Sequence, residues 1–334
     1  MRFQKKSVEE LYEEGLERLD RFDLDGAIRV GKELKKRRHS SAFEILGRAY
    51  QGKGEPDKAV EVLEEGVSLA PADSDLWEQL GCYYSDLERY DEAESALRRA
   101  LESENDRRSA VLLNLAILYS RADRPEESLQ LLDSLPPGEV NSLFVAVYKV
   151  DALTELLRFE EAITLADTSI LLTEEEEDLD RPVTGRGAEA VSVLSMLGSL
   201  YAKRGRAVWL GRKDGEAALR DAWRALELDR RNPQAAWLVR GVENQISPDG
   251  KYYRILLEGR WHEPIEGSEA PPGFYVGYDV VADSELEALE LIKRFEPAGV
   301  RDSLRIDKKE VLEARPDEPK GVYRANRGYS FFDE

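Results

Sequence analysis

The sequence predicts an all-α solenoid of about six helical hairpins, followed by a small α+β domain. Three observations carry this prediction. Residues 43–71 are repeated in residues 77–105, a small residue recurs at similar intervals along the helical part, and short β-prone segments replace the helical pattern from Lys251 onward. Self-similarity at a period of about 20–50 residues is typical of repeat arrays. The 334 residues are enough for such an array and a second domain.

The two clearest repeat units match each other at fixed offsets of 34 residues. The matched pairs are Leu46/Leu80, Gly47/Gly81, Tyr50/Tyr84, Ala59/Ala93 and Leu63/Leu97. This order of residue types resembles the tetratricopeptide repeat (TPR), although Asn105 stands where the first unit has Pro71. The resemblance implies a unit of two antiparallel helices that buries its apolar faces by stacking on its neighbours.

Weaker copies of the unit flank this pair. The small residue of the second helix recurs as Ala27, Ala59, Ala93, Ser128, Ala162 and Ala218. We therefore predict six units, at residues 7–39, 40–73, 74–108, 109–142, 143–173 and 191–232. The larger last spacing is attributed to an acidic linker (174–187) and to an insertion within 204–215 that lengthens the turn of the sixth hairpin. A capping helix over 232–246, with Pro233 in its first turn, is expected to close the solenoid.

The helices follow from apolar spacing and from their boundaries. Leu76, Leu80, Tyr83 and Tyr84 form one apolar stripe at helical spacing. Glycine or alanine at the helix contacts lets two backbones approach closely. Asp, Glu or Pro stands at the start of each second helix, where the helix dipole favours negative charge. We place the whole solenoid, cap included, in residues 1–248.

The remaining residues, 249–334, are predicted to form a β-β-α-β-β domain. Segments 252–262, 274–283, 303–315 and 322–332 are predicted strands, and Ser284 with Glu287 forms a capping box for a helix over 284–295. Its LLEGR-like strand, GFY…VVAD centre and GYSFF-like end resemble small uncharacterised bacterial proteins. That resemblance implies no known activity.

The amino-acid composition argues against several classes of function. The net charge is −20, which disfavours binding to nucleic acid phosphates. One cysteine and two histidines leave no basis for a disulfide framework or a metal centre, and no nucleotide-binding motif occurs. The longest apolar run, 111–119, is too short to span a membrane, and the N-terminus lacks a signal-peptide pattern. We expect a cytoplasmic protein without cofactors.

The resemblance also suggests where a partner would bind. In tetratricopeptide proteins the first helices of successive units line a concave groove that receives peptide segments. Carried over by offset, the groove positions include Glu44, Gln51, Glu78, Ser85, Ser195, Ser199 and Lys203. The residues that we select as the binding site are Arg48, Cys82, Leu113, Ile117, Arg121, Phe144, Val147 and Asp151. The middle of this set is apolar and its flanks are polar. The competing interpretation is that the weak repeats are tilted, or that the C-terminal domain folds back and covers these residues.

The sequence therefore favours a non-catalytic interaction scaffold that binds a peptide or helix of another protein, possibly a basic one. Two alternatives remain open. The first is a homo-oligomer assembled through the C-terminal sheet edge or the aromatic end Tyr329, Phe331 and Phe332. The second is a ligand-binding or enzymatic C-terminal domain, for which Trp261-His262-Glu263 is the most enzyme-like cluster.

Overall fold

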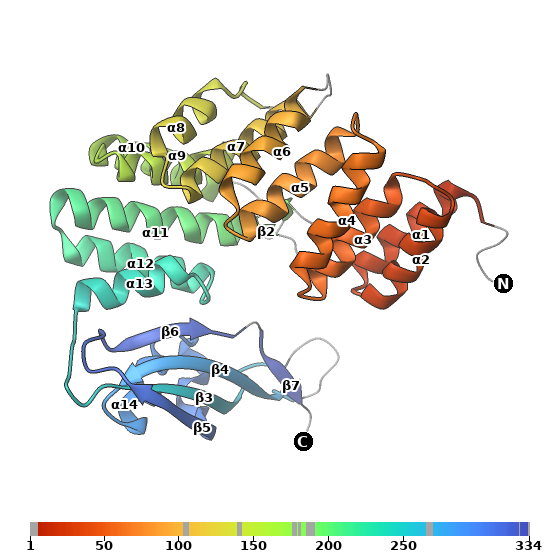
Figure 1. Cartoon of the computed structure of the whole chain (residues 1–334). Coiled ribbons are helices and arrows are strands. Elements are labelled where there is room, and N and C mark those ends of the chain that lie inside the picture. The colour runs from red at the N-terminus through yellow and green to blue at the C-terminus, as the bar shows by residue number, and fades with distance from the viewer. Residues whose placement is uncertain are drawn as a thin grey trace. The chain divides into compact units, whose positions relative to one another are not determined.

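The computed structural model describes residues 6–102, 107–138, 142–175, 179, 182–184, 191–264, 270–326 and 328–332. The chain divides into two compact units (Figure 1). Unit 1 comprises Met1–Leu156 with Pro182–Val191, and unit 2 comprises Leu157–Arg181 with Ser192–Glu334. Most of the predicted acidic linker, residues 176–178, 180–181 and 185–187, lies outside the described residues. Two short strands, β1 (Pro182–Thr184) and β2 (Val191–Ser192), precede the helices of the sixth repeat.

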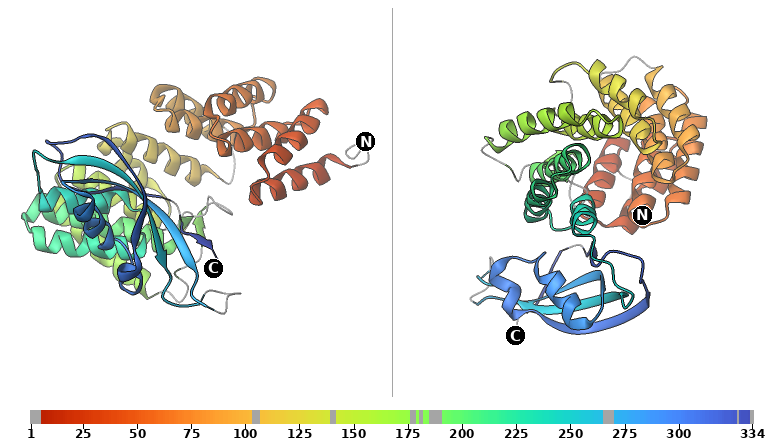
Figure 2. Two further views of the ribbon diagram at one scale, coloured as in Figure 1. Left: turned by 90° about the horizontal axis from the view of Figure 1, so that it is seen from below. Right: turned by 90° about the vertical axis from the view of Figure 1, so that its left-hand side faces the viewer.

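Unit 1 consists of successive antiparallel helices, each packed against the next (Figures 1 and 2). They are α1 (Val8–Asp20), α2 (Leu24–Lys36), α3 (Ser41–Gly52), α4 (Pro56–Leu69), α5 (Ser74–Asp86), α6 (Tyr90–Leu101), α7 (Arg108–Arg121), α8 (Pro125–Ser134) and α9 (Ser142–Glu155). The odd-numbered helices also contact the next odd-numbered helix. This is the arrangement that the repeat predicts, with first helices side by side.

Local sequence sets the ends of these helices. Ser7 and Glu10 form a capping box on α1, Asp23 and Asp73 cap α2 and α5, and proline opens α4 and α8. Each hairpin turn contains one residue in the left-handed region, with φ between 58° and 71°: Phe22, Gly54, Glu88, Asp123, Leu157 and Lys213. The repeated turn therefore has the same backbone geometry in every hairpin, although only one of its residues is glycine.

The small residue of the second helix is fully buried in all six repeats. Ala27, Ala59, Ala93, Ser128, Ala162 and Ala218 each have 0 % exposure. At Ser128 the hydroxyl donates a hydrogen bond of 2.8 Å to the carbonyl oxygen of Ala116, which satisfies the one polar group at this position. In the hairpins α1–α2, α3–α4, α5–α6, α7–α8 and α11–α12 the two helices are in contact, and a small side chain lets them approach.

The glycines of the first helices differ in how tightly they are packed, and this gives a stability prediction. A Cβ atom on Gly81 would lie 2.6 Å from Cγ of the buried Leu97, whereas one on Gly47 would lie 3.2 Å from Cγ of Leu63. We expect Gly81→Ala to lower the free energy of unfolding by about 1–3 kcal/mol. Gly47→Ala should cost less, because its added Cβ atom makes a longer contact, while the gain of about 0.5–1 kcal/mol for alanine over glycine in a helix is common to both positions. Urea unfolding followed by circular dichroism measures both; an equal or larger loss for Gly47→Ala would contradict the packing argument.

Unit 2 begins with α10 (Phe159–Glu174), α11 (Val193–Arg212), α12 (Gly215–Leu228) and α13 (Pro233–Glu243). The fifth predicted hairpin is therefore divided between the units, since α9 belongs to unit 1 and α10 to unit 2. The capping helix is present as α13, with Asn232 as its N-cap and Pro233 in its first turn. It packs against both α11 and α12.

The prediction that the insertion lengthens the turn of the sixth hairpin is wrong. The inserted residues continue α11 to Arg212, and the turn is short. The cause is burial on α13: Ala207 and Val208 are buried, and Trp209 contacts Trp237 edge-to-face at 5.8 Å. An extended helix gains this contact, whereas a longer loop would leave the same apolar residues exposed.

The C-terminal part of unit 2 is a five-stranded antiparallel sheet. Its strands are β3 (Lys251–Arg260), β4 (Gly273–Ala282), β5 (Arg305–Ala314), β6 (Gly321–Ala325) and β7 (Ser330–Phe332). The order is β5-β3-β4-β6, and β7 pairs with the other end of β4. The predicted strand 322–332 is thus two strands, because the chain leaves β4 after Ala325 and returns at Ser330.

One face of the sheet carries the core of this part. Tyr253, Ile255 and Leu257 of β3 lie opposite Val280, Tyr278 and Val276 of β4, and all six are buried. Helix α14 (Glu285–Lys293), capped by Ser284 as predicted, contacts β4 and β6, and the 3₁₀-helix η2 (Ala298–Ser303) contacts β3. The predicted fold, a helical solenoid followed by a small antiparallel α+β region, is confirmed. The boundary at residue 248 stays a prediction, because α13 also contacts β6 within unit 2.

Candidate functional sites

The predicted groove residues lie on the first helices of four consecutive hairpins in unit 1. Arg48 is on α3, Cys82 on α5, Leu113, Ile117 and Arg121 on α7, and Phe144, Val147 and Asp151 on α9. We call the surface formed by these helices the first-helix face. It also carries Glu44, Glu78, Asp86, Asn114 and Tyr148, at helical spacing from the predicted residues.

Two polar clusters join neighbouring helices across this face. Glu78 of α5 accepts hydrogen bonds from Arg107 at 3.0 Å and from Asn114 of α7 at 2.9 Å. Arg121 of α7 donates to Asp86 at 2.7 Å and to Ser85 at 3.2 Å, both on α5. Burial raises the pKa of Glu78, although Arg107 opposes the shift. These contacts fix the spacing between α5 and α7.

A third polar cluster lies on the N-terminal side of the face. Tyr12 of α1 donates a hydrogen bond of 2.8 Å to Glu44 of α3, which also lies 3.7 Å from Arg48. Gln51, one turn further along α3, donates to Asp86 at 3.4 Å. Polar contacts therefore connect the first helices from α1 to α7. The repeat offsets also place Glu44, Gln51 and Ser85 in the groove, but they do not predict the contacts of Tyr12 and Asp86.

The middle of the face is apolar, and most of its side chains are only partly exposed. Cys82, Leu113, Ile117 and Phe144 are half-buried, and Phe144 lies 5.3 Å from Tyr148 between ring centroids. Val147 is 4 % exposed, so it belongs to the core more than to the surface. Tyr148 is the aromatic residue that sequence reasoning missed; its spacing of four residues from Phe144 was the available signal.

The surroundings of Cys82 strongly raise the pKa of its thiol. Burial raises the pKa of its thiol to about 12, and the nearby carboxylates of Glu78 and Asp86 add to the rise. Arg121 and Arg107 act in the opposite direction without reversing it. The thiol is therefore uncharged at neutral pH and contributes to the face as a small apolar group.

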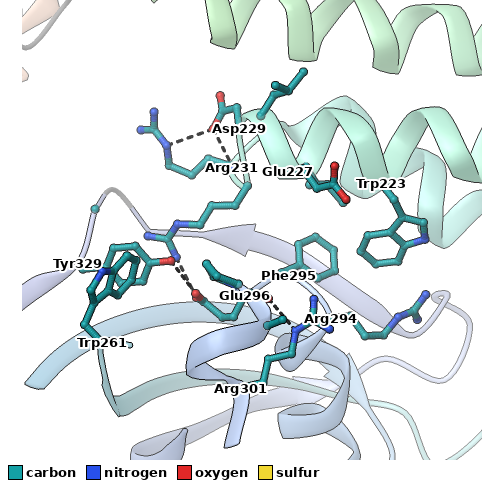
Figure 3. A pocket seen from close by; sticks show the side chains of 16 residues that line it. Trp223, Glu227, Asp229, Arg231, Trp261, Arg294, Phe295, Glu296, Arg301 and Tyr329 are labelled. Carbon is teal, nitrogen blue, oxygen red and sulfur yellow. Dashed lines mark hydrogen bonds and ion pairs between the residues drawn. The ribbon is translucent and has the colours of Figure 1, made fainter. Parts of the chain in front are cut away.

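A second candidate site is a pocket of about 1040 Å³ in unit 2. Its walls come from α12, the turn between α12 and α13, the end of β3, the segment after α14 and the segment before β7. Figure 3 shows Trp261 and Tyr329 on one side, Trp223 and Phe295 on the other, and Arg301 below them. Sequence reasoning singled out Trp261 and Tyr329 but did not predict a shared pocket.

A buried acidic residue organises the left-hand wall of this pocket. The side chain of Glu296 has no exposed surface and lies 3.0 Å from Arg230, from Nη1 to Oε1. Its carboxylate also accepts hydrogen bonds from the hydroxyl groups of Tyr278 and, at 2.6 Å, Tyr329. The Arg230 guanidinium stacks 4.0 Å from the centre of the Tyr329 ring. One arginine and two tyrosines thus converge on one carboxylate, and Figure 3 shows Tyr329 beside Glu296.

The enzyme-like cluster Trp261-His262-Glu263 directly follows β3. The rings of Trp261 and His262 lie 5.2 Å apart, and His262 and Glu263 are exposed. Within the described part of the chain, no three His, Cys, Asp or Glu side chains form a group that could hold a metal ion. No helix there is both long and apolar enough to cross a membrane.

The residues proposed for assembly between copies have contacts within the chain. Tyr329 binds Glu296, Phe332 stacks on Tyr275 at 4.9 Å, and β7 pairs with β4. One edge strand of the sheet is β5, which carries several charges and departs from regular pairing with β3 at two places. Charges and bulges are features that oppose edge-to-edge pairing. Homo-oligomerisation through this sheet stays a prediction.

The stacked hairpins of unit 1 and the face formed by their first helices define a helical-repeat protein. Residues 41–81 and residues 85–148 match two models of the tetratricopeptide repeat family. Within these two segments the chain carries tetratricopeptide repeats. Neither matched family model is that of an enzyme.

Solved structures agree with this assignment at the level of the fold. The crystal structure of the APC/C hetero-tetramer Cut9–Hcn1 is 12 % identical, has a TM-score of 0.54 and is matched over 73 % of this chain and 44 % of that chain. This chain therefore spans less than half of that protein. A Pseudomonas aeruginosa PilF structure is 16 % identical, with a TM-score of 0.52, over 70 % of this chain and 97 % of that one. No curated protein sequence matches the chain.

Proposed function

We propose that this protein is a non-catalytic, cytoplasmic interaction scaffold whose first-helix face binds a peptide segment or helix of another protein. The observation that carries the proposal is the combination of polar contacts and half-buried apolar side chains on one face. The contacts from Tyr12 to Arg121 hold four first helices in register. Ile117 and Phe144 are half-buried apolar residues on the same face, and they take no part in these polar contacts.

The chemistry of this face suits a partner that contributes apolar anchors. Binding energy at such interfaces is concentrated in a few apolar or aromatic contacts, while surrounding charges set the register. Arg48 and Arg121 already have acidic partners, so the face has no large excess of positive charge. With a net charge of −20, the whole chain would favour a basic partner in the first encounter.

Site-specific photo-crosslinking tests this proposal. A photoreactive phenylalanine at position 144 should capture the partner, whereas the same residue at the exposed position 95 of α6 should not. Mass spectrometry of the crosslink identifies the partner segment, which can then be made as a peptide. We expect Ile117→Glu with Phe144→Glu to weaken the binding of that peptide by at least about 100-fold, since burying two unpaired charges is costly.

The matched control is Phe22→Glu with Leu69→Glu. These two residues are 58 % and 70 % exposed and lie in unit 1 outside the first-helix face, so the control adds the same charge to the same unit. It should bind the peptide like the unaltered chain. Equal crosslinking at positions 144 and 95, or equal affinity of both double variants with native circular dichroism, would refute the proposal.

A further inference from the structure

The pocket of unit 2 combines aromatic walls with a shortage of acceptor groups. Trp223 and Phe295 meet edge-to-face at 5.4 Å, and Trp261 and Tyr329 do so at 4.9 Å. The volume of about 1040 Å³ is at the upper end of what small-molecule sites occupy. These walls suit a planar, largely apolar ligand body.

Every acidic side chain in the lining already has an arginine partner. Glu227 lies 3.0 Å from Arg224, Asp229 lies 3.5 Å from Arg231, and Glu296 lies 3.0 Å from Arg230. Asp229 also accepts a hydrogen bond from Ser195, and both oxygens of Glu296 accept from tyrosines. The three carboxylates of the lining are thus already paired with other side chains of the protein.

Two arginines in the same lining keep unused donor groups. Nη2 of Arg230 is buried and has no hydrogen-bond partner among the described residues. Arg301 donates its Nε to the carbonyl oxygen of Glu296 at 2.8 Å, but among the residues that the structure describes it has no ion-pair partner. Arg294, by contrast, is paired with Glu243. A buried donor without a partner is costly, so an acceptor supplied by a ligand would relieve it.

We propose that this pocket binds a small aromatic anion, whose carboxylate or phosphate group accepts hydrogen bonds from Arg301 and Arg230 while its ring lies among the aromatic walls. The net charge of −20 would repel an anion from most of the surface. Binding of an anion in this pocket therefore depends on the unpaired donor groups of Arg230 and Arg301. A guanidinium group matches the planar oxygens of either anion.

Fluorescence titration of the full chain provides the test. The first probe is 1-anilinonaphthalene-8-sulfonate, an aromatic anion, and the second is N-phenyl-1-naphthylamine, which has the same rings without the charge. We expect the anion to bind at least about tenfold more tightly than the neutral probe. Arg301→Gln should remove about tenfold of that affinity, which is the usual loss for one charge-assisted hydrogen bond. Arg220→Gln, at an exposed site on α12 outside the pocket, should leave it unchanged.

Competition then distinguishes the two kinds of anion. Displacement of the bound probe by AMP at lower concentration than by benzoate indicates a phosphate ligand, and the reverse order indicates a carboxylate. The proposal is overturned if both probes bind equally, if Arg301→Gln binds the anion as the unaltered chain does, or if neither competitor displaces it. None of these results depends on the first-helix face of unit 1.

Discussion

Glu296→Ala should lower the free energy of unfolding of unit 2 by about 3–5 kcal/mol, which is the usual cost of removing one partner of a buried ion pair. The substitution leaves Arg230, whose side chain is 14 % exposed, without its countercharge. It also removes the acceptor of the Tyr278 and Tyr329 hydroxyl groups. Glu296→Gln keeps an acceptor without the charge and should cost less.

Tryptophan fluorescence during urea unfolding measures this effect selectively. Trp209, Trp223, Trp237 and Trp261 belong to unit 2, so a Trp77→Phe background reports that unit alone. Glu290→Ala is the matched control, because the Glu290 side chain is 60 % exposed and pairs only with Lys293 on the same helix. We expect it to change stability by less than about 0.5 kcal/mol. Equal effects of the two alanine variants would show that the Glu296 network contributes no net stability.

Cys82 should react with iodoacetamide at pH 8 about 10³-fold more slowly than an ordinary exposed thiol. Only the thiolate reacts, and a pKa of about 12 leaves far less of it than the ordinary pKa near 8.5. The rate should rise tenfold per pH unit well beyond pH 9. Mass spectrometry of the alkylated chain over time measures both the rate and its pH dependence.

A cysteine at the exposed position 95 provides the control for this reactivity. In a Cys82→Ala background, Ser95→Cys should react at the rate of a free thiol, and denatured wild-type chain should do the same. Rapid alkylation of Cys82 in the folded chain would contradict the buried, acidic surroundings described for it. Slow alkylation that did not depend on pH would show that steric access, rather than the pKa, protects the thiol.

The helical hairpins could be predicted because the repeat is a local pattern. The small residues from Ala27 to Ala218 mark helix contacts within about 30 residues of chain, and the structure buries each of them completely. The extension of α11 was missed for a non-local reason. Trp209 gains its burial from Trp237 on α13, and no spacing within 204–215 reveals that contact. The division of 322–332 into β6 and β7 likewise depends on pairing with β4.

The two candidate sites differ in the same way. Offsets from the repeat place Arg121 and Cys82 on first helices. The pairing of Arg121 with Asp86 joins two successive hairpins, and the offsets do not indicate it. The pocket of unit 2 is less predictable still, because its lining comes from several distant segments between Trp223 and Tyr329. Trp261 and Tyr329 stood out as aromatic residues, yet nothing near them in sequence indicates Arg230 or Glu296.

The contacts of α12 within unit 2 also limit how this repeat array could have grown by duplication. A hairpin inserted between α12 and α13 would separate these two helices and would remove Trp223 of α12 from Phe295, which follows α14. A hairpin inserted among α1–α8 would leave all of these contacts intact. Gain or loss of repeats in related chains is therefore expected in the N-terminal hairpins, while the last hairpin, its cap and the sheet are inherited together.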